Sequence, residues 1–287
     1  MKNGGGRYGD DNINCTNEVH VDTGYCSIIK EISTGVKLWI GRQNSVLEES
    51  ITDWLLDQLS YRIPFIHYKS FTRNEEAKFT GADWEWFIVL DDGGIKFRVQ
   101  AKKLRFNVDN YPAIAYSNNY GMQIDKLIDA ALMDNAIPIY AFYTSTSGDT
   151  LCRIRVNDEG VYTADAYGIR DRVINVQRVY VSSDNIMYLS LPLSCMFCCS
   201  LFTDQSNVEN YSRFLNTYFS AFKNSENTSQ NTRGIYNALP GYIESFVKYS
   251  TEKLPEWWEK EFQHKLRNIA GLLVTDLRND QIRHWRK

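Results

Sequence analysis

Two acidic side chains, Asp83 and Glu85, stand two residues apart in the segment Gly81-Ala-Asp-Trp-Glu-Trp. If this segment is a β-strand, both carboxylates lie on one face, and Trp84 and Trp86 lie on the other. Two neighbouring carboxylates repel each other unless a cation or a shared proton relieves the repulsion. The pattern therefore predicts a strand with one packed face and one face that could do chemistry.

A second polar pair, Gln100 and Lys102, has the same two-residue spacing in Lys96-Phe-Arg-Val-Gln-Ala-Lys-Lys-Leu. The intervening Asp91-Asp-Gly-Gly predicts a tight turn, so the two segments are expected to pair and to bring both polar pairs to one surface. Carboxylate and amide oxygens are hard ligands that suit Mg²⁺ or Mn²⁺. A lysine beside them could activate water or stabilise charge that builds on a phosphate.

The elements that position these residues can be predicted from hydrophobic periodicity. Ser45 followed by Glu48 fits a capping box at the start of the first helix. The order helix, strand, strand, helix, strand predicts an α/β fold, a mixed β-sheet flanked by helices. The expected ranges are a helix at 45–62, strands at 83–90 and 96–104, a helix at 121–134 and a strand at 137–143.

The second half of the chain has weaker patterns and is expected to be mostly helical. We expect three parts: an N-terminal extension at 1–40, the core at 41–145, and a C-terminal region at 146–287 that completes the fold and contributes substrate or partner contacts. The further ranges are strands near 151–156 and 175–182, helices across 207–222, 240–250 and 255–268, and a strand beginning at Leu272.

Composition limits the class of protein. The chain has 287 residues, 43% of them hydrophobic, and a formal net charge of −3. Such a length predicts one or two domains. The charge argues against a general nucleic-acid coat, but not against an enzyme whose basic residues gather at one cleft. Lys96, Arg98 and Lys103 are among the basic residues that could follow a phosphate backbone there.

The cysteines and the start of the chain predict a cytoplasmic protein with reduced thiols. The six cysteines are irregularly spaced, and no basic-then-apolar signal peptide precedes them. The pair Cys195 and Cys198, with Cys199 adjacent, could be half of a zinc site, but no second ligand pair follows, so buried thiols are favoured. The uncharged stretch at 186–202 is short for a membrane span and predicts a buried strand and turn, with no membrane contact.

The helical glutamate, the strand aspartate and the sequence Gln100-Ala101-Lys102 together resemble the PD-(D/E)XK, or restriction-endonuclease-like, nuclease superfamily. The match is to the variant in which glutamine replaces the second acid, as in Mrr-like restriction enzymes. The strings Gly81-Ala-Asp-Trp-Glu-Trp and Gln-Ala-Lys-Lys-Leu also resemble an uncharacterised bacterial family associated with defence. The resemblance covers about residues 45–143, with a weaker match near Leu273.

The resemblance implies a role for each matching residue. It implies that Asp83 and Gln100 bind Mg²⁺, for which Mn²⁺ can substitute, and that Lys102 is the catalytic lysine. Helical Glu48 would help to hold metal or water, although its neighbour Glu49 is an alternative. Helix geometry favours Glu48, which lies nearer the apolar stripe. The substrate-binding residues would be Gln123 and Lys103, and we infer from the residues alone that Glu85 supplies the charge that Gln100 lacks.

These expectations combine into one hypothesis and two rivals. The first is a metal-dependent endonuclease that hydrolyses phosphodiester bonds, with double-stranded DNA as the expected partner and antiviral defence as the expected role. It could act as a homodimer or with a defence-system partner protein. The rivals are a catalytically inactive binding or regulatory protein that kept the nuclease fold, and an RNase effector.

Overall fold

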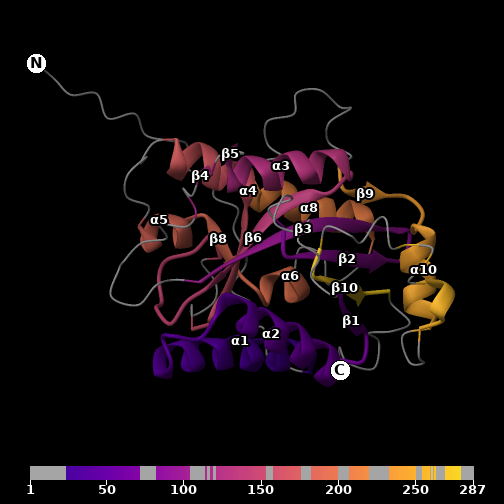
Figure 1. The fold of residues 1–287 in the computed structure, drawn as a ribbon, viewed down its shortest axis with the longest axis horizontal. Coiled ribbons are helices and arrows are strands. Elements are labelled where there is room, and N and C mark those ends of the chain that lie inside the picture. The colour runs from indigo at the N-terminus through magenta and orange to yellow at the C-terminus, as the bar shows by residue number, and fades with distance from the viewer. Residues whose placement is uncertain are drawn as a thin grey trace, which may run out of the picture.

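The structure, a computed structural model, describes residues 24–71, 82–103, 114, 117–118, 121–152, 158–175, 182–199, 207–219, 233–249, 254–258, 260, 262 and 269–278. Within these residues the chain forms a mixed β-sheet with helices on both of its faces (Figure 1). The expected α/β fold class, a mixed sheet flanked by helices, is confirmed.

Among the described residues the main sheet has eight strands: seven follow the order β1-β10-β2-β3-β6-β7-β8, and β9 pairs with β3 beside this path. The central strand β3 runs antiparallel to β2 and parallel to β6. The late strand β10 lies between β1 and β2, so the chain returns to the sheet near its end. The strands are β1 (Ile66–Ser70), β2 (Trp84–Leu90), β3 (Gly93–Lys103), β6 (Ile137–Tyr143), β7 (Val161–Asp165), β8 (Ser190–Pro192), β9 (Ile235–Tyr236) and β10 (Gly271–Asp276), and a separate pair is β4 (Ser117–Asn118) with β5 (Gly121–Met122).

The helices divide between the two faces of the sheet. In Figure 1, α1 and α2 lie below the strands and α3 lies above them. Four helices share one hydrophobic cluster with the first face: α1 (Tyr25–Arg42), α2 (Glu48–Arg62), α6 (Cys195–Cys198) and α8 (Val208–Tyr218). The second face carries α3 (Gln123–Met133), α4 (Ala166–Ile169), the π-helical turn Arg170–Ile174, α5 (Ser183–Tyr188) and, in a separate cluster, α10 (Gly241–Lys248).

Alternation along β2 and β3 assigns their side chains to these faces. Trp84 and Trp86 are buried in the cluster that contains α1 and α2, as their spacing predicts. The opposite face of β3 carries Lys96, Arg98, Gln100 and Lys102, whereas residues on either side of this row belong to two separate apolar clusters. A row of buried polar side chains therefore crosses the second face.

The hairpin between β2 and β3 depends on a glycine. Gly93 has φ +153°, and a Cβ at this position would lie 2.0 Å from the backbone oxygen of Tyr236. Any other residue would clash with β9 as well as strain the backbone. The turn predicted at residues 91–94 is therefore needed both for the hairpin and for the strand that joins β3 beside it.

Most of the expected core elements have close counterparts. The helices at 45–62 and 121–134 and the strands at 83–90, 96–104 and 137–143 are confirmed with small shifts at their ends. The boundary expected at residue 40 falls inside α1, which packs in the same cluster as α2. Most of 151–156 and of 175–182, where two short strands were expected, and much of 255–268 lie outside the described residues.

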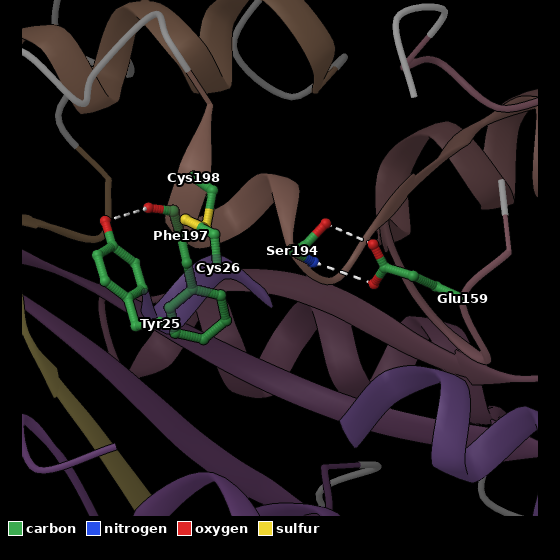
Figure 2. Close-up of a disulfide and its surroundings, with 6 residues drawn as sticks. All are labelled: Tyr25, Cys26, Glu159, Ser194, Phe197 and Cys198. Carbon is green, nitrogen blue, oxygen red and sulfur yellow. Dashed lines mark hydrogen bonds between the residues drawn. A yellow bond between two sulfur atoms is a disulfide. The ribbon is translucent and has the colours of Figure 1, made fainter. Parts of the chain in front are cut away.

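The expectation of reduced thiols is wrong for two cysteines. Cys26 in α1 and Cys198 in α6 form a disulfide across 172 residues of sequence, with their Cα atoms 6.0 Å apart (Figure 2). Next to it, the Tyr25 hydroxyl donates a hydrogen bond to the Phe197 carbonyl at 3.4 Å. Packing of α1 against α6 brings the two cysteines together, and sequence spacing cannot reveal that contact.

The stretch at 186–202 is not a single strand and turn. Its described part contains the end of α5, then β8, then α6. The start of α6 is held by Glu159, whose carboxylate accepts hydrogen bonds from the Ser194 backbone N–H at 3.2 Å and from the Ser194 hydroxyl (Figure 2). No helix among the described residues is long and apolar enough to cross a membrane.

Candidate active site

Asp83 and Gln100 meet where β3 approaches its last residues. The backbone N–H of Asp83 donates to the Val99 carbonyl at 2.8 Å, which continues the β2–β3 pairing by one residue and sets Asp83 beside Gln100. The Gln100 amide Nε2 donates to Asp83 Oδ2 at 2.6 Å, and the Ala101 backbone N–H donates to the same oxygen at 2.7 Å. The structure thus brings together two of the predicted metal ligands.

Gln100 is held at both ends of its carboxamide. Its Nε2 also donates to the Ala101 carbonyl at 3.1 Å, and its Oε1 accepts a hydrogen bond from Gln123 Nε2 at 3.0 Å. Gln123 is the first residue of α3, so this contact ties the helix to the site. Gln123, predicted to bind substrate, contacts Gln100 in the structure.

Glu48 and Lys102 form the second half of the group. Lys102 Nζ lies 3.5 Å from Glu48 Oε1, and the Lys103 backbone N–H donates to Glu48 Oε2 at 2.7 Å. Glu48 is the first residue of α2, whose N-terminus therefore reaches the end of β3. Of the two glutamates that the sequence left open, Glu49 is exposed and Glu48 faces this group.

The surroundings of Glu48 change its acidity. Burial raises the pKa of Glu48 above the ordinary glutamate value, although the Lys102 ammonium and the Lys103 N–H act in the opposite direction. Lys102 and the Lys103 N–H thus favour the ionised form of this half-buried carboxylate, against the effect of burial.

The expected capping box at Ser45 and Glu48 is wrong. The N-cap of α2 is Leu47, with no side-chain hydrogen bond to the helix, and Ser45 is exposed. The Glu48 carboxylate is already engaged by Lys102 and the backbone of Lys103. The Glu48 carboxylate therefore contacts residues distant in the sequence and does not cap the start of α2.

Lys103, the other residue predicted to bind substrate, directs its ammonium group to backbone carbonyls of the protein. Its ammonium donates to the backbone carbonyls of Asn44, at 2.8 Å, and of Val46. Both carbonyls lie in the connection that precedes α2. These contacts and its backbone N–H make Lys103 a residue that fixes the position of Glu48.

Glu85 belongs to a separate network further along the same face. It is 1% exposed, and its carboxylate contacts Lys96 Nζ at 3.2 Å, Arg98 Nη2 at 3.8 Å and the Tyr242 hydroxyl. Asp134, after α3, pairs with the same two cations. The structure therefore does not bring Glu85 into the group of Asp83, Gln100, Lys102 and Glu48.

The same network corrects the expectation for Lys96 and Arg98. Both side chains are buried and paired with Glu85 and Asp134, so they do not offer an exposed track for a phosphate backbone. Sequence reasoning missed their acidic partner Asp134 and the Tyr242 hydroxyl, because these come from elements distant in the chain. Tyr140, which lies opposite Gln100 in the register of β3 and β6, was also missed.

The donor set at Asp83 fits a hard cation only if amide and backbone oxygens take part. Among the described residues, no three His, Cys, Asp or Glu side chains are grouped to hold a metal. Asp83 Oδ2 and the Ala101 carbonyl are both within hydrogen-bond distance of Gln100 Nε2, which lies between them. Half a turn of the Gln100 amide would bring Oε1 to face Asp83 in place of Nε2, and it would end the hydrogen bond that Oε1 accepts from Gln123.

A comparison with protein-family models places this chain among its relatives. The model described as "Family of unknown function (DUF6615)" matches residues 25–281, which is most of the chain. The chain belongs to this family. Among curated proteins, none matches it significantly.

Proposed function

We propose that this member of the DUF6615 family is a metal-dependent nuclease that hydrolyses phosphodiester bonds of nucleic acid. The observation that carries the proposal is two contacts at the end of β3: Gln100 with Asp83, the residue before β2, and Lys102 with Glu48 of α2. Gln100 and Lys102 lie two residues apart, on one face of that strand. Two carboxylates, one carboxamide and one buried lysine at the end of adjacent strands are a set of groups suited to phosphoryl chemistry.

The residues divide into two roles. Asp83, Gln100 and the Ala101 carbonyl would hold Mg²⁺ or Mn²⁺, which would supply a Lewis acid for the phosphate and lower the pKa of water. Lys102 provides the positive charge that stabilises the phosphate as negative charge develops during attack. Glu48 keeps Lys102 oriented, and Lys103 keeps Glu48 in place through its backbone N–H.

We leave Glu85 out of the proposed metal site. Its carboxylate is shared between Lys96 and Arg98 and accepts a hydrogen bond from Tyr242. Recruiting it to a metal would leave two buried cations with one fewer counter-charge, which is costly at this depth. Its role in the proposal is to neutralise the row of basic side chains on β3.

The test of the proposal is cleavage of nucleic acid by the purified protein. Supercoiled plasmid, linear duplex DNA and single-stranded RNA are incubated with Mg²⁺, Mn²⁺ or EDTA, and products are followed on gels. We expect metal-dependent cutting of DNA that falls at least about a hundredfold in Asp83→Asn and in Lys102→Met, since each removes a group of the proposed site.

Asp53→Asn is the matched control, because Asp53 is an exposed carboxylate on α2 outside the group. Equal cutting by the wild type, Asp83→Asn and Lys102→Met would contradict the assignment of the site. Cutting of RNA alone would replace DNA by RNA as the substrate. A role in antiviral defence remains a prediction from the resemblance.

One observation favours a second candidate, a nuclease-fold protein that binds a partner without catalysis. Asp83 Oδ2 accepts two hydrogen bonds, and each Glu48 oxygen contacts a donor, so protein groups already engage these carboxylate oxygens. Calorimetry with Mn²⁺ separates the candidates. Binding that Asp83→Asn abolishes supports the enzyme, whereas no binding by the wild type supports the inactive fold.

A further inference from the structure

Two buried hydroxyl groups, those of Thr52 and Tyr143, connect the start of α2 to the end of β6. The Thr52 hydroxyl donates to the Glu48 carbonyl at 3.0 Å and lies 2.9 Å from the Tyr143 hydroxyl. Thr52 is 5% exposed, and Tyr143 is fully buried. Neither residue belongs to the candidate site described above, yet their hydrogen bonds end on Glu48, which does.

The direction of these hydrogen bonds follows from the number of hydrogens. The Thr52 hydroxyl has one hydrogen, and the Glu48 carbonyl accepts it. Tyr143 is therefore the donor in its contact with Thr52. Burial raises the pKa of Tyr143 well above the ordinary tyrosine value, so its hydroxyl keeps the proton that it donates. The hydrogen bonds run from Tyr143 through Thr52 to the backbone of Glu48.

Glu48 is thus held from the ends of two adjacent strands. Tyr143 stands opposite Lys103 in the parallel pairing of β3 and β6. The Lys103 backbone N–H donates to Glu48 Oε2 at 2.7 Å, and Tyr143 acts on the Glu48 carbonyl through Thr52. The end of β3 contacts the carboxylate of this residue, and the end of β6 is connected to its backbone.

A purely local explanation covers only half of this arrangement. Threonine in a helix often donates to the carbonyl four residues earlier, as Thr217 does to Arg213 on α8 at 2.9 Å. The Thr52 oxygen also accepts a hydrogen bond from a different element. Valine at 52 and phenylalanine at 143 would fill nearly the same space without any buried hydroxyl, so packing alone does not require the pair.

We propose that Thr52 and Tyr143 are positioning residues that fix the start of α2 so that the Glu48 carboxylate meets Lys102. This inference rests on the proposed nuclease function, in which Glu48 orients Lys102 towards the phosphate. Lys102 Nζ lies 3.5 Å from Glu48 Oε1, so a small displacement of α2 breaks the contact. Reaction rates are sensitive to displacements of about 1 Å in the groups that act on the substrate.

The first test is single-turnover cleavage of supercoiled plasmid in Mg²⁺ by Thr52→Val and Thr52→Ser. We expect Thr52→Val to cleave at least about fivefold more slowly than the wild type, the worth of one hydrogen bond. Thr52→Ser keeps the hydroxyl and should stay within about twofold of the wild type. The matched control is Thr217→Val, which removes the same kind of helical hydrogen bond on α8. Equal rates in Thr52→Val and Thr217→Val would overturn the inference.

The second test repeats Thr52→Val in a Glu48→Gln background. If Thr52 acts through Glu48, its loss should cost less than about twofold there, because the charge that it positions is already gone. A general loss of structure predicts the same fold-change in both backgrounds. That additive result would overturn the inference, even if Thr52→Val is slow on its own.

Tyr143→Phe approaches the same contact from β6. It leaves the Thr52 hydroxyl in place and removes the group that ties it to the strand, so we expect slower cleavage that again depends on Glu48. The control is Tyr162→Phe, which removes a buried hydroxyl that donates to the Glu159 carbonyl at 2.9 Å. Each rate is measured at a temperature where thermal unfolding shows the variant to be folded. A Tyr143→Phe rate no lower than that of Tyr162→Phe would overturn the inference.

The outcomes also separate this inference from the proposed function. If the wild type cleaves and Thr52→Val cleaves equally fast, only the positioning role is overturned. If the wild type cleaves no nucleic acid under any metal condition, the proposed function fails and the inference fails with it.

Discussion

Glu48 is a half-buried carboxylate that contacts two particular donors, the Lys102 ammonium and the Lys103 N–H. Burial raises its pKa, while Lys102 and the Lys103 N–H favour its ionised form. The balance makes it sensitive to small changes that leave an exposed glutamate unaffected. Its neighbour Glu49 has the same chemistry, is exposed, and provides a direct comparison.

We expect Glu48→Gln to reduce metal-dependent cleavage at least about tenfold, because Lys102 loses the charge that orients it. Glu49→Gln is expected to leave the rate within about twofold of the wild type. The measurement is the initial rate of plasmid cutting at saturating Mg²⁺. Equal losses in the two variants would contradict the choice of Glu48, and a loss in Glu49→Gln alone would reverse it.

Alternation along a strand identified the face of Asp83, Gln100 and Lys102, but not the partners that meet each side chain on that face. Glu85 shows the limit. It points to the same face of the sheet as Asp83, yet its partners are Lys96, Arg98 and Tyr242. Alternation predicts the face of the sheet to which the Glu85 side chain points. Its contact with Tyr242 depends on how α10 packs against that face.

At the scale of elements, strand β3 carries two groups of polar side chains. Gln100 and Lys102 near its end belong to the candidate site, and Lys96 and Arg98 before them belong to a buried ionic network. The Lys96 and Arg98 cations sit between Glu85 and Asp134, so two buried positive charges meet two negative ones. Such an arrangement is stable only while every partner remains. Asp134 lies directly after α3 and therefore couples the helix that carries Gln123 to the sheet.

This coupling predicts a pH dependence of stability. Burial opposes ionisation of Asp134, but Arg98 and Lys96 outweigh it, so the pKa of Asp134 is lowered from the ordinary 3.8. A carboxyl group with a depressed pKa stabilises the fold above its unfolded-state pKa, and this contribution is lost as pH falls through the folded-state pKa. Asp134→Asn should therefore be less stable than the wild type at pH 7, and the difference should shrink below about pH 4.

Urea unfolding of the two proteins between pH 7 and pH 3 measures that difference. A gap that stays constant over the range would show that Asp134 contributes through packing and not through its charge. The exposed pair of Glu209 and Arg213, 3.1 Å apart on α8, gives the control variant Glu209→Gln. It should change stability little at any pH, since surface ion pairs contribute weakly.

The elements themselves could largely be predicted from the sequence. Periodicity identified the core helices and strands between residues 45 and 143 because their apolar residues recur at regular spacing. It could not give the strand order, in which β10 lies between β1 and β2. Nor could it show that Glu48 contacts Lys102 and does not form a capping box with Ser45. Both the strand order and this contact depend on segments that are distant in the sequence.

The whole molecule is joined across its length in two ways. The sheet incorporates β10 from near the end of the matched family region, and the Cys26–Cys198 disulfide links α1 to α6. The pairing of β10 with β2 and the disulfide each connect a segment from early in the chain with one from late in the chain. The residues of the candidate site come from the first half of the chain, but the sheet that carries them includes a strand from the second half.

The disulfide predicts a redox-dependent stability. Breaking a crosslink that spans 172 residues should lower the free energy of unfolding by about 2–5 kcal/mol. We expect Cys26→Ser to show this loss and to become insensitive to dithiothreitol, and Cys199→Ser, which leaves the bond intact, to respond to dithiothreitol as the wild type does. Urea unfolding with and without reductant is the measurement, and a wild type unaffected by full reduction would contradict it.

The central claim is that Asp83 and Gln100 form a cation site, and Gln100→Glu tests it most directly. The change replaces the 2.6 Å amide–carboxylate hydrogen bond with two adjacent carboxylates. Gln58→Glu is the control, because Gln58 donates to the Asp57 carboxylate at 3.3 Å in an exposed hydrogen bond on α2. The measurement is thermal unfolding of both variants in EDTA and in millimolar Mn²⁺.

The account predicts that Gln100→Glu loses roughly 1.5–3 kcal/mol of stability in EDTA, the worth of a hydrogen bond to a charged group. Mn²⁺ should restore most of this loss, since a cation between the carboxylates relieves their repulsion and binds only the folded protein. Gln58→Glu should respond to neither condition. A Gln100→Glu protein that Mn²⁺ stabilises no more than Gln58→Glu would contradict the cation site and, with it, the proposed function.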